Sequence, residues 1–407
     1  MSYGTYGVDW ETRVDFDKLR KERLARAKEQ LKESNLGSLI CFDPSNIRYI
    51  TSTWLHWGTE KHLTRYCVLP KGAEPFLFEI GAAAMARKEP HGAPWLGDRV
   101  LPAVTWGRGA VPREVKAAER CVSGVKKVLM DYGVADEPVG LDIFDVPLMN
   151  AVQNAGLQIA DGQEVMLNAR CIKSEGEIEL LKTAASQVDA AYSKVRNAIR
   201  PGVRENDLVA LVHQTLYSMG ADDVENVNCI SGPRTNPHHH DWSDRALRPG
   251  DLVFLDIQSR WNGYITCYYR TFSCGEPTKE QKDLNRDCVS WLKASIDAVR
   301  PGATTADIAK AWPGPEVLGF KTEQEALANQ WGHGIGLSLW ELPVISRAFS
   351  LDHPFPIKKN MVFALETYAG KLGQRNGVRI EDEVVVTDSG CEVITTYPRD
   401  ELIACPL

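Results

Sequence analysis

Two short segments of the chain repeat one pattern, and this repeat constrains the fold more than any other feature. Residues 198–208 read AIRPGVRENDL, and residues 298–308 read AVRPGATTADI. Each copy follows a stretch of helical periodicity, which the Pro-Gly pair must end. Because the match includes the helix end and the later Asp-aliphatic pair, it indicates a duplicated α-β unit. We expect two similar halves that close around a shared site.

The chain before this repeat has a different organisation. Residues 17–34 predict a charged amphipathic helix, and short strand-like and helix-like segments then alternate to about residue 165. Ser174 and Glu177 form a predicted capping box that opens a long helix. The sequence therefore predicts an α/β (α+β) protein with a smaller mixed α/β domain at 1–170 and a second domain at 171–407.

Composition and charge exclude several classes of protein. The net charge is -7 with no long basic run, so nucleic acid and anionic membranes are not expected partners. No apolar run approaches the roughly 18 residues of a membrane span. Acidic residues near the N-terminus argue against a secretory signal. The ten cysteines include no C-x-x-C pair, which favours buried thiols in a reducing compartment. We expect a cytoplasmic protein.

Two predicted β-hairpins place carboxylates in strands that otherwise look buried. The strands cover residues 250–258, 263–272, 361–370 and 378–387. They contain Asp256, Glu366 and Glu381. A buried carboxylate is costly unless it is paired, hydrogen-bonded or bound to a metal. Any one of these acids could be a salt-bridged core residue. The three together with His333, in the loop GHGIG, favour a metal or acid-base site.

The order of these motifs resembles a known family. The chain contains K-S-x-x-E-I-E-L-L, S-G-x-R-T-N-P, G-D-L-V-F-L-D, H-G-I-G-L and I-E-D in sequence. It resembles the creatinase/prolidase/aminopeptidase P superfamily over nearly its whole length, and is nearest in character to the non-peptidase members. The resemblance implies a creatinase-like N-terminal domain, a C-terminal pita-bread catalytic domain with duplicated α-β halves, and a homodimer.

The resemblance also implies a set of metal ligands. The family's two-ion site uses Asp, Asp, His, Glu and Glu, which correspond here to Asp256, Cys267, His333, Glu366 and Glu381. Cys267 thus replaces the second Asp. A thiolate binds Zn or Fe but cannot bridge two ions with two oxygens. We expect one divalent ion (Zn, Fe or Mn), while metal-free catalysis stays open because creatinase, a member of the superfamily, works without metal.

The substrate side departs from the peptidases as well. Their pattern H-G-I-G-L-x-x-H-E-x-P reads HGIGLSLWELP here, so Trp340 replaces the second His. A Trp offers an apolar wall or a face for a cation. By resemblance, His239 takes the place of the family's substrate-side His, with His238 beside it in a loop that could otherwise be merely solvated. Further residues assigned to substrate binding are Arg270, Trp54, Trp57 and Arg65.

We therefore expect a hydrolase that cleaves a C–N bond of a small, non-peptide molecule. With metal, Glu366 would accept a proton from water and His239 would stabilise the oxyanion. Without metal, His239 would be the main base, and Glu366 and Glu381 would bind a cationic substrate group. Three alternatives remain: a dimethylsulfoniopropionate-type lyase, which D-P-x-N-I-R-Y and S-G-P-R-T-N-P also resemble, an Xaa-Pro dipeptidase, and a non-catalytic binding module.

Overall fold

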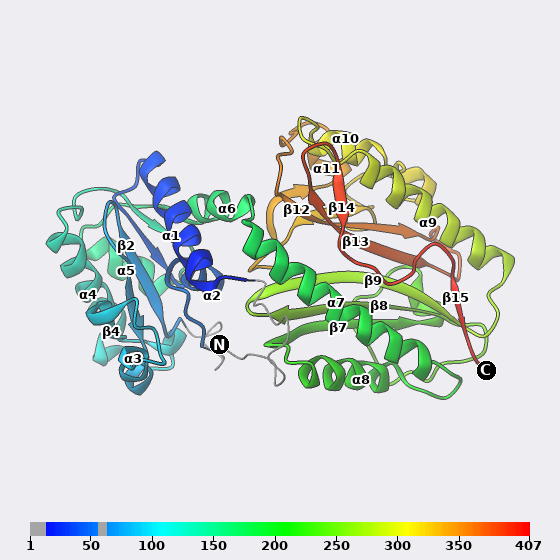
Figure 1. The fold of residues 1–407 in the computed structure, drawn as a ribbon, viewed down its shortest axis with the longest axis horizontal. Coiled ribbons are helices and arrows are strands. Elements are labelled where there is room, and N and C mark those ends of the chain that lie inside the picture. The colour runs from blue at the N-terminus through cyan, green and yellow to red at the C-terminus, as the bar shows by residue number, and fades with distance from the viewer. Residues whose placement is uncertain (1–13, 56–62) are drawn as a thin grey trace. The chain divides into compact units, whose positions relative to one another are not determined.

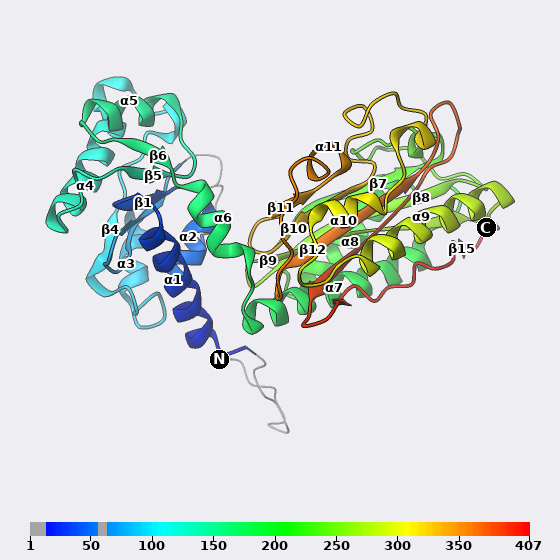
Figure 2. The same ribbon diagram turned by 90° about the horizontal axis from the view of Figure 1, so that it is seen from above.

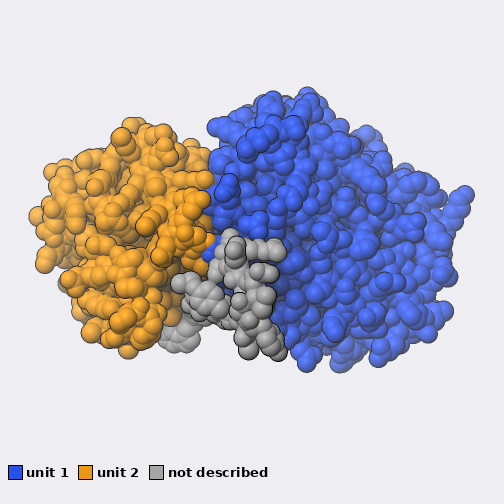
Figure 3. Space-filling model, in the orientation of Figure 1, with its two compact units in different colours: residues 1–14, 171–407 blue, residues 15–170 orange. Residues whose placement is uncertain are grey.

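The computed structural model describes residues 14–55 and 63–407. The chain separates into two compact units, of which one is residues 15–170 and the other is built from residues 171–407 (Figure 3). Among the described residues, no helix is both long enough and apolar enough to cross a lipid bilayer.

The unit of residues 15–170 is a mixed sheet flanked by helices (Figure 1). Its strands follow the order β4-β3-β2-β1-β5-β6. They are β1 (Ser38–Cys41), β2 (Tyr66–Pro70), β3 (Phe76–Glu79), β4 (Val100–Pro102), β5 (Val139–Leu141) and β6 (Ile159–Asp161). The helices are α1 (Phe16–Glu33), α2 (Pro44–Thr51), α3 (Gly81–Lys88), α4 (Ala117–Asp131), α5 (Val146–Asn154) and α6 (Gln163–Cys171). Strand β1 pairs antiparallel with β2 and parallel with β5, as a mixed α/β domain requires.

The unit of residues 171–407 contains two sheets. One has the order β15-β9-β8-β7 and the other β11-β10-β12-β13-β14. The strands are β7 (Asp223–Ser231), β8 (Leu252–Trp261), β9 (Tyr264–Cys274), β10 (Trp331–Gly334), β11 (Glu341–Ile345), β12 (Val362–Ala369), β13 (Val378–Val386), β14 (Cys391–Val393) and β15 (Ile403–Cys405). The helices are α7 (Glu175–Ala198), α8 (Glu205–Ser218), α9 (Lys279–Asp297), α10 (Thr305–Lys310) and α11 (Arg347–Ser350). Short 3-10 helices across both units cover Gly97–Arg99, Gly107–Gly109, Arg113–Val115, Gly232–Thr235 and Pro315–Leu318.

Each half of this unit has its own apolar core. Helices α7 and α8 pack against β7, β8 and β9, where Tyr192 and Leu255 are fully buried. Helices α9 and α10 pack on the other sheet, where Leu292 and Phe363 are fully buried (Figure 1, Figure 2). The two predicted hairpins are present as β8–β9 and β12–β13. The predicted α/β fold class is therefore confirmed.

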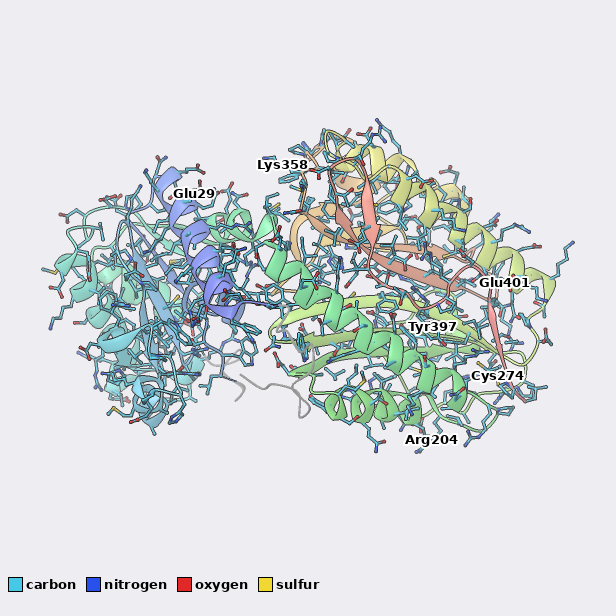
Figure 4. All side chains as sticks on the ribbon, viewed as in Figure 1. Glu29, Arg204, Cys274, Lys358, Tyr397 and Glu401 are labelled. Atoms are coloured by element: carbon cyan, nitrogen blue, oxygen red, sulfur yellow. The ribbon has the colours of Figure 1, made fainter. Side chains whose placement is uncertain are left out.

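The Asp that recurs in the sequence repeat has the same structural role at the start of α8 and at the start of α10. Arg204 lies at the beginning of α8 (Figure 4). Its backbone N–H donates a hydrogen bond to the Asp207 carboxylate at 3.0 Å. Asp307 accepts one from the N–H of Thr304 at 2.8 Å. Both aspartates therefore cap a helix at the same position of its first turn. The repeated Asp residues serve the fold and not the chemistry.

The two halves meet where β9 runs beside β13. The backbone N–H of Cys267 and the hydroxyl of Thr266 both donate to Glu383, at 2.7 Å and 3.0 Å. The hydroxyl of Thr271 donates to the carbonyl of Arg379 at 2.7 Å. In the register of β12 and β13, Glu366 lies directly opposite Glu381. This junction brings the acids of both hairpins toward one place.

Candidate active site

A cavity of about 340 Å³ opens within the unit of residues 171–407. Strands β7, β8, β9, β10, β12 and β13 all contribute to its wall. Its lining is Asn226, Asn228, His240, Asp241, Asp256, Gln258, Cys267, Tyr269, Ala328, Trp331, His333, Leu339, Trp340, Glu366 and Arg379. Four of the five predicted metal ligands therefore line one cavity, and the fifth, Glu381, lies against it through Cys267.

Three of the predicted ligands are grouped closely enough to hold one ion. The Cys267 sulfur, a ring nitrogen of His333 and a carboxylate oxygen of Glu381 all lie within 4.8 Å of one another. The Cys267 thiol donates to Oε1 of Glu381 at 3.2 Å. All three side chains are buried.

Two carboxylate oxygens of the five predicted metal ligands are buried without a hydrogen-bond partner among the described residues. They are Oδ1 of Asp256 and Oε2 of Glu381. Burial raises the pKa of Asp256 to about 7 and raises that of Glu381 well above its usual range, in both cases with a contribution from Glu366. Unpaired buried carboxylates are expensive. Oxygen, nitrogen and sulfur donors facing one space fit a divalent cation, which would satisfy these atoms.

His333 is oriented in the way expected of a metal-binding imidazole. Its Nδ1 lies 3.0 Å from the carbonyl oxygen of Gly334, so Nδ1 must carry the proton. Its Nε2 lies 3.7 Å from Oε1 of Glu366. Burial lowers the pKa of His333, which favours the neutral form that binds metals. The Trp340 ring stacks on the imidazole with 4.6 Å between ring centroids.

Arg379 is the main site residue that the sequence analysis missed. Its guanidinium forms an ion pair with Oε2 of Glu366 and donates to the carbonyl oxygens of Ala328 and Asn329 at 2.7 Å and 3.1 Å. The guanidinium also lies over the Tyr269 ring, 4.9 Å from its centroid. The signal was available, because Arg379 lies two residues before Glu381 in β13 and so points to the same face.

The histidine loop differs from the expectation. His239 is exposed, and it is not among the residues that line the cavity. His238 instead packs on Phe254, with 5.2 Å between ring centroids, and its Nε2 is buried without a partner in the described part of the chain. Burial lowers the pKa of His238 strongly, so its ring is neutral. His240 lines the cavity. Of the three histidines, His240 is the one that the structure places in the cavity wall, and the role of His239 stays a prediction.

Arg270 does not lie where a substrate-binding residue would. It is fully buried and donates to the carbonyl oxygens of Tyr397 and Glu381 and, at 2.8 Å, to the carboxylate of Asp382. These contacts engage the guanidinium within the protein, where it supports β13. The assignment of Arg270 to substrate binding stays a prediction.

The N-terminal residues assigned to substrate binding belong to the unit of residues 15–170. Arg65 is buried and paired with Glu79 at 2.9 Å, so its charge is already satisfied there. Trp54 is half-buried, with the Arg48 guanidinium 5.3 Å from its ring centroid. Trp57 lies outside the described residues.

Comparison with known proteins identifies a family and several relatives that match most of the chain. Metallopeptidase family M24 matches residues 179–388. The chain is 31% identical to a probable dipeptidase PepE of Mycobacterium tuberculosis, over 76% of this chain and 85% of the relative. It is 22% identical to the dimethylsulfoniopropionate lyase DddP of Roseovarius nubinhibens, over 98% of this chain and 91% of the relative.

The fold is shared with solved structures. A crystal structure of dipeptidase PepE from Mycobacterium ulcerans superimposes with a TM-score of 0.76 at 25% identity, over 97% of this chain and 100% of that one. An Xaa-Pro dipeptidase from Bacillus anthracis gives a TM-score of 0.76 at 22% identity, over 95% and 100% of the two chains. These neighbours confirm the pita-bread architecture. The chain belongs to metallopeptidase family M24, within the creatinase/prolidase/aminopeptidase P superfamily that its motifs indicate.

Proposed function

We propose that this protein is a metal-dependent hydrolase that cleaves a C–N bond in a small, non-peptide substrate. The observation that carries the proposal is the cluster of Cys267, His333 and Glu381, whose donor atoms lie within 4.8 Å of one another. Two buried oxygens, one of Asp256 and one of Glu381, add to it because they have no hydrogen-bond partner in the part of the chain that the structure describes. Such a cluster has little structural purpose without a cation.

Asp256, Cys267, His333 and Glu381 would hold the cation. Bound there, a divalent ion supplies Lewis-acid activation of water and of the scissile group. The remaining chemistry depends on side chains that face the same cavity.

Glu366 is the proposed proton acceptor. Arg379 holds its Oε2, while its Oε1 faces His333 at 3.7 Å and has no hydrogen bond to a described residue. One oxygen is thus fixed and the other is available. A carboxylate held in this way can take a proton from the attacking water and return it to the departing nitrogen.

His240 is the proposed group on the substrate side, with His238 behind it. His240 lines the cavity, whereas His238 does not, and the two rings meet edge to face with 4.3 Å between centroids. Burial lowers the pKa of His240, which favours its neutral form. An imidazole N–H at that position can donate to a developing oxyanion.

The size and lining of the cavity favour a small substrate that is not a peptide. Its volume of about 340 Å³ is near the lower end of the range for ligand sites. Trp340 and Trp331 meet edge to face with 5.4 Å between ring centroids and supply an aromatic wall. Such a wall favours an apolar or cationic group over a peptide backbone, whose polar atoms need hydrogen bonds.

A lyase reaction on a sulfonium compound is the second candidate. The similarity to the dimethylsulfoniopropionate lyase spans 98% of this chain, against 76% for the dipeptidase. In that reaction Glu366 would remove a proton beside a carboxylate, and no water would be consumed. The Trp340 face would suit the sulfonium cation.

A substrate panel tests the proposal. The metal-loaded protein is incubated with creatine-like compounds, cyclic amidines, Xaa-Pro dipeptides and dimethylsulfoniopropionate, in water enriched in heavy oxygen. We expect C–N cleavage with one heavy oxygen in the product. Volatile sulfide without oxygen incorporation would establish the lyase, and cleavage of dipeptides alone would establish the peptidase. Turnover of no compound by the metal-loaded protein would favour a binding module.

A further inference from the structure

Gln258 and Cys267 face each other at the metal cluster. They are directly opposed in the register of β8 and β9, and both line the cavity. Neither side chain offers a carboxylate at this place. The identities of these two residues therefore affect how many carboxylate oxygens of the site are available to bind a cation.

Gln258 occupies one oxygen of Asp256. Its Nε2 donates to Oδ2 at 2.7 Å, and the amide of Asn228 donates to the same oxygen at 3.4 Å. Only Oδ1 of Asp256 is left without a partner among the described residues. Asp256 can therefore offer one oxygen to a cation while these hydrogen bonds persist.

The carboxylate of Glu366 likewise has one oxygen engaged by another side chain. Arg379 holds Oε2 of Glu366, so a single oxygen of that group is open. Cys267 contributes one sulfur and no second atom. Two adjacent ions are normally joined by carboxylates that use both oxygens. Glu381 is then the one predicted carboxylate ligand whose two oxygens could both reach a cation, so the open atoms favour one ion over two.

The donor types also discriminate between metals. Thiolate and imidazole favour zinc, whereas manganese prefers carboxylate, carbonyl and water oxygens. We propose that this chain holds a single zinc ion through the Cys267 thiolate, with His333 and Glu381, and that Gln258 is a positioning residue that keeps Asp256 from bridging a second ion. The inference rests on the proposed metal-dependent function, and it specifies the ion and the number of ions.

Cobalt substitution tests the thiolate ligand. A thiolate bound to Co²⁺ gives an intense near-ultraviolet charge-transfer band, which we expect in the full chain loaded with Co²⁺. The band should disappear in Cys267→Ser. It should remain in Cys391→Ser, a matched control because Cys391 is half-buried in β14 and does not line the cavity. An unchanged band in a folded Cys267→Ser protein, or no band in the unaltered chain, would overturn the ligand assignment.

Metal stoichiometry tests the one-ion site. Elemental analysis after dialysis should give one zinc per chain. The double variant Cys267→Asp/Gln258→Ala should bind two Mn²⁺, and its preference for zinc over manganese should fall by about tenfold or more. Cys267→Asp alone should bind fewer ions than the double variant, because Gln258 still occupies Asp256. Gln214→Ala, at an exposed position, should behave as the unaltered chain does.

Two ions in the unaltered chain would overturn the inference, and so would a single ion in a folded double variant. Both readouts need no substrate. An inactive protein with one zinc would therefore count against the proposed function alone, whereas an active hydrolase with two manganese ions would count against the inference alone.

Discussion

The thiol of Cys267 donates a hydrogen bond to Oε1 of Glu381 at 3.2 Å. The first residue lies in β9 and the second in β13, so the bond joins the two halves of the 171–407 unit. The backbone of Cys267 is held in turn by Glu383 at 2.7 Å. A site built across this junction depends on the packing of both hairpins and cannot form from either half alone.

Replacing Glu366 by Gln should remove the proton acceptor and keep the shape of the side chain. We expect kcat/KM to fall by about 10²–10⁴-fold, the usual effect of losing general acid-base catalysis. Steady-state rates on the substrate identified by the panel provide the measurement. Glu392→Gln, at an exposed site, is the matched control and should keep full activity. Equal activity of the two variants would remove Glu366 from the mechanism.

The histidine loop offers a comparison between adjacent residues. His240→Ala should reduce kcat by about 10²-fold or more, because a donor to the developing oxyanion is lost from the cavity wall. His239→Ala should leave kcat within about twofold, since its side chain is exposed and outside the cavity. The same substrate and the same metal loading are used for both. A stronger effect at His239 than at His240 would support the assignment made from sequence.

The buried ion pair between Lys173 and Glu341 should stabilise the unit that carries the site. Nζ of Lys173 lies 2.9 Å from the Glu341 carboxylate, and both side chains are 1% exposed. Lys173→Met removes the cationic partner of a buried carboxylate and should lower the free energy of unfolding by about 3–5 kcal/mol in urea. Lys182→Met breaks the exposed pair with Glu392 and should cost less than about 1 kcal/mol. Equal effects would contradict this account.

The metal-free protein should lose stability as the pH rises. Burial raises the pKa of Asp256 from 3.8 to about 7 and that of Glu383 from 4.5 to about 8. A carboxyl whose pKa is higher in the folded state favours folding at low pH, and this contribution is lost between about pH 4 and pH 8. A bound cation reverses the trend at Asp256, because it prefers the ionised carboxylate.

Thermal unfolding at pH 5 and pH 8, with chelator and with metal, provides the measurement. The increase in Tm on adding metal should be larger at pH 8 than at pH 5. Asp256→Asn keeps the shape and removes the titration, so its metal-free Tm should vary less with pH. An increase that is larger at pH 5 would contradict the assignment of Asp256 to the cation.

Local sequence signals were sufficient for the elements and for most acids of the site. Segments that look buried apart from their acids predicted strands at 250–258 and 378–387, and the structure has β8 and β13 there. The same segment placed Glu381 in a strand that is buried along its whole length. These features depend on neighbours in sequence, which is why they could be predicted.

Contacts between distant segments could not be predicted in this way. Gln258 reaches Asp256 within one strand, but its position opposite Cys267 depends on the register of two strands. The partners of Arg270 come from β13 and from the segment after β14. In the loop of three consecutive histidines no periodicity tells which ring turns inward, and the packing of His238 on Phe254 decides it.

Anomalous diffraction from crystals of the metal-loaded protein locates the bound cation. We expect a single strong anomalous peak within bonding distance of the Cys267 sulfur, His333 and Glu381, with Oδ1 of Asp256 facing it. A cavity without anomalous density in metal-loaded crystals, or a metal bound only elsewhere on the chain, would contradict it.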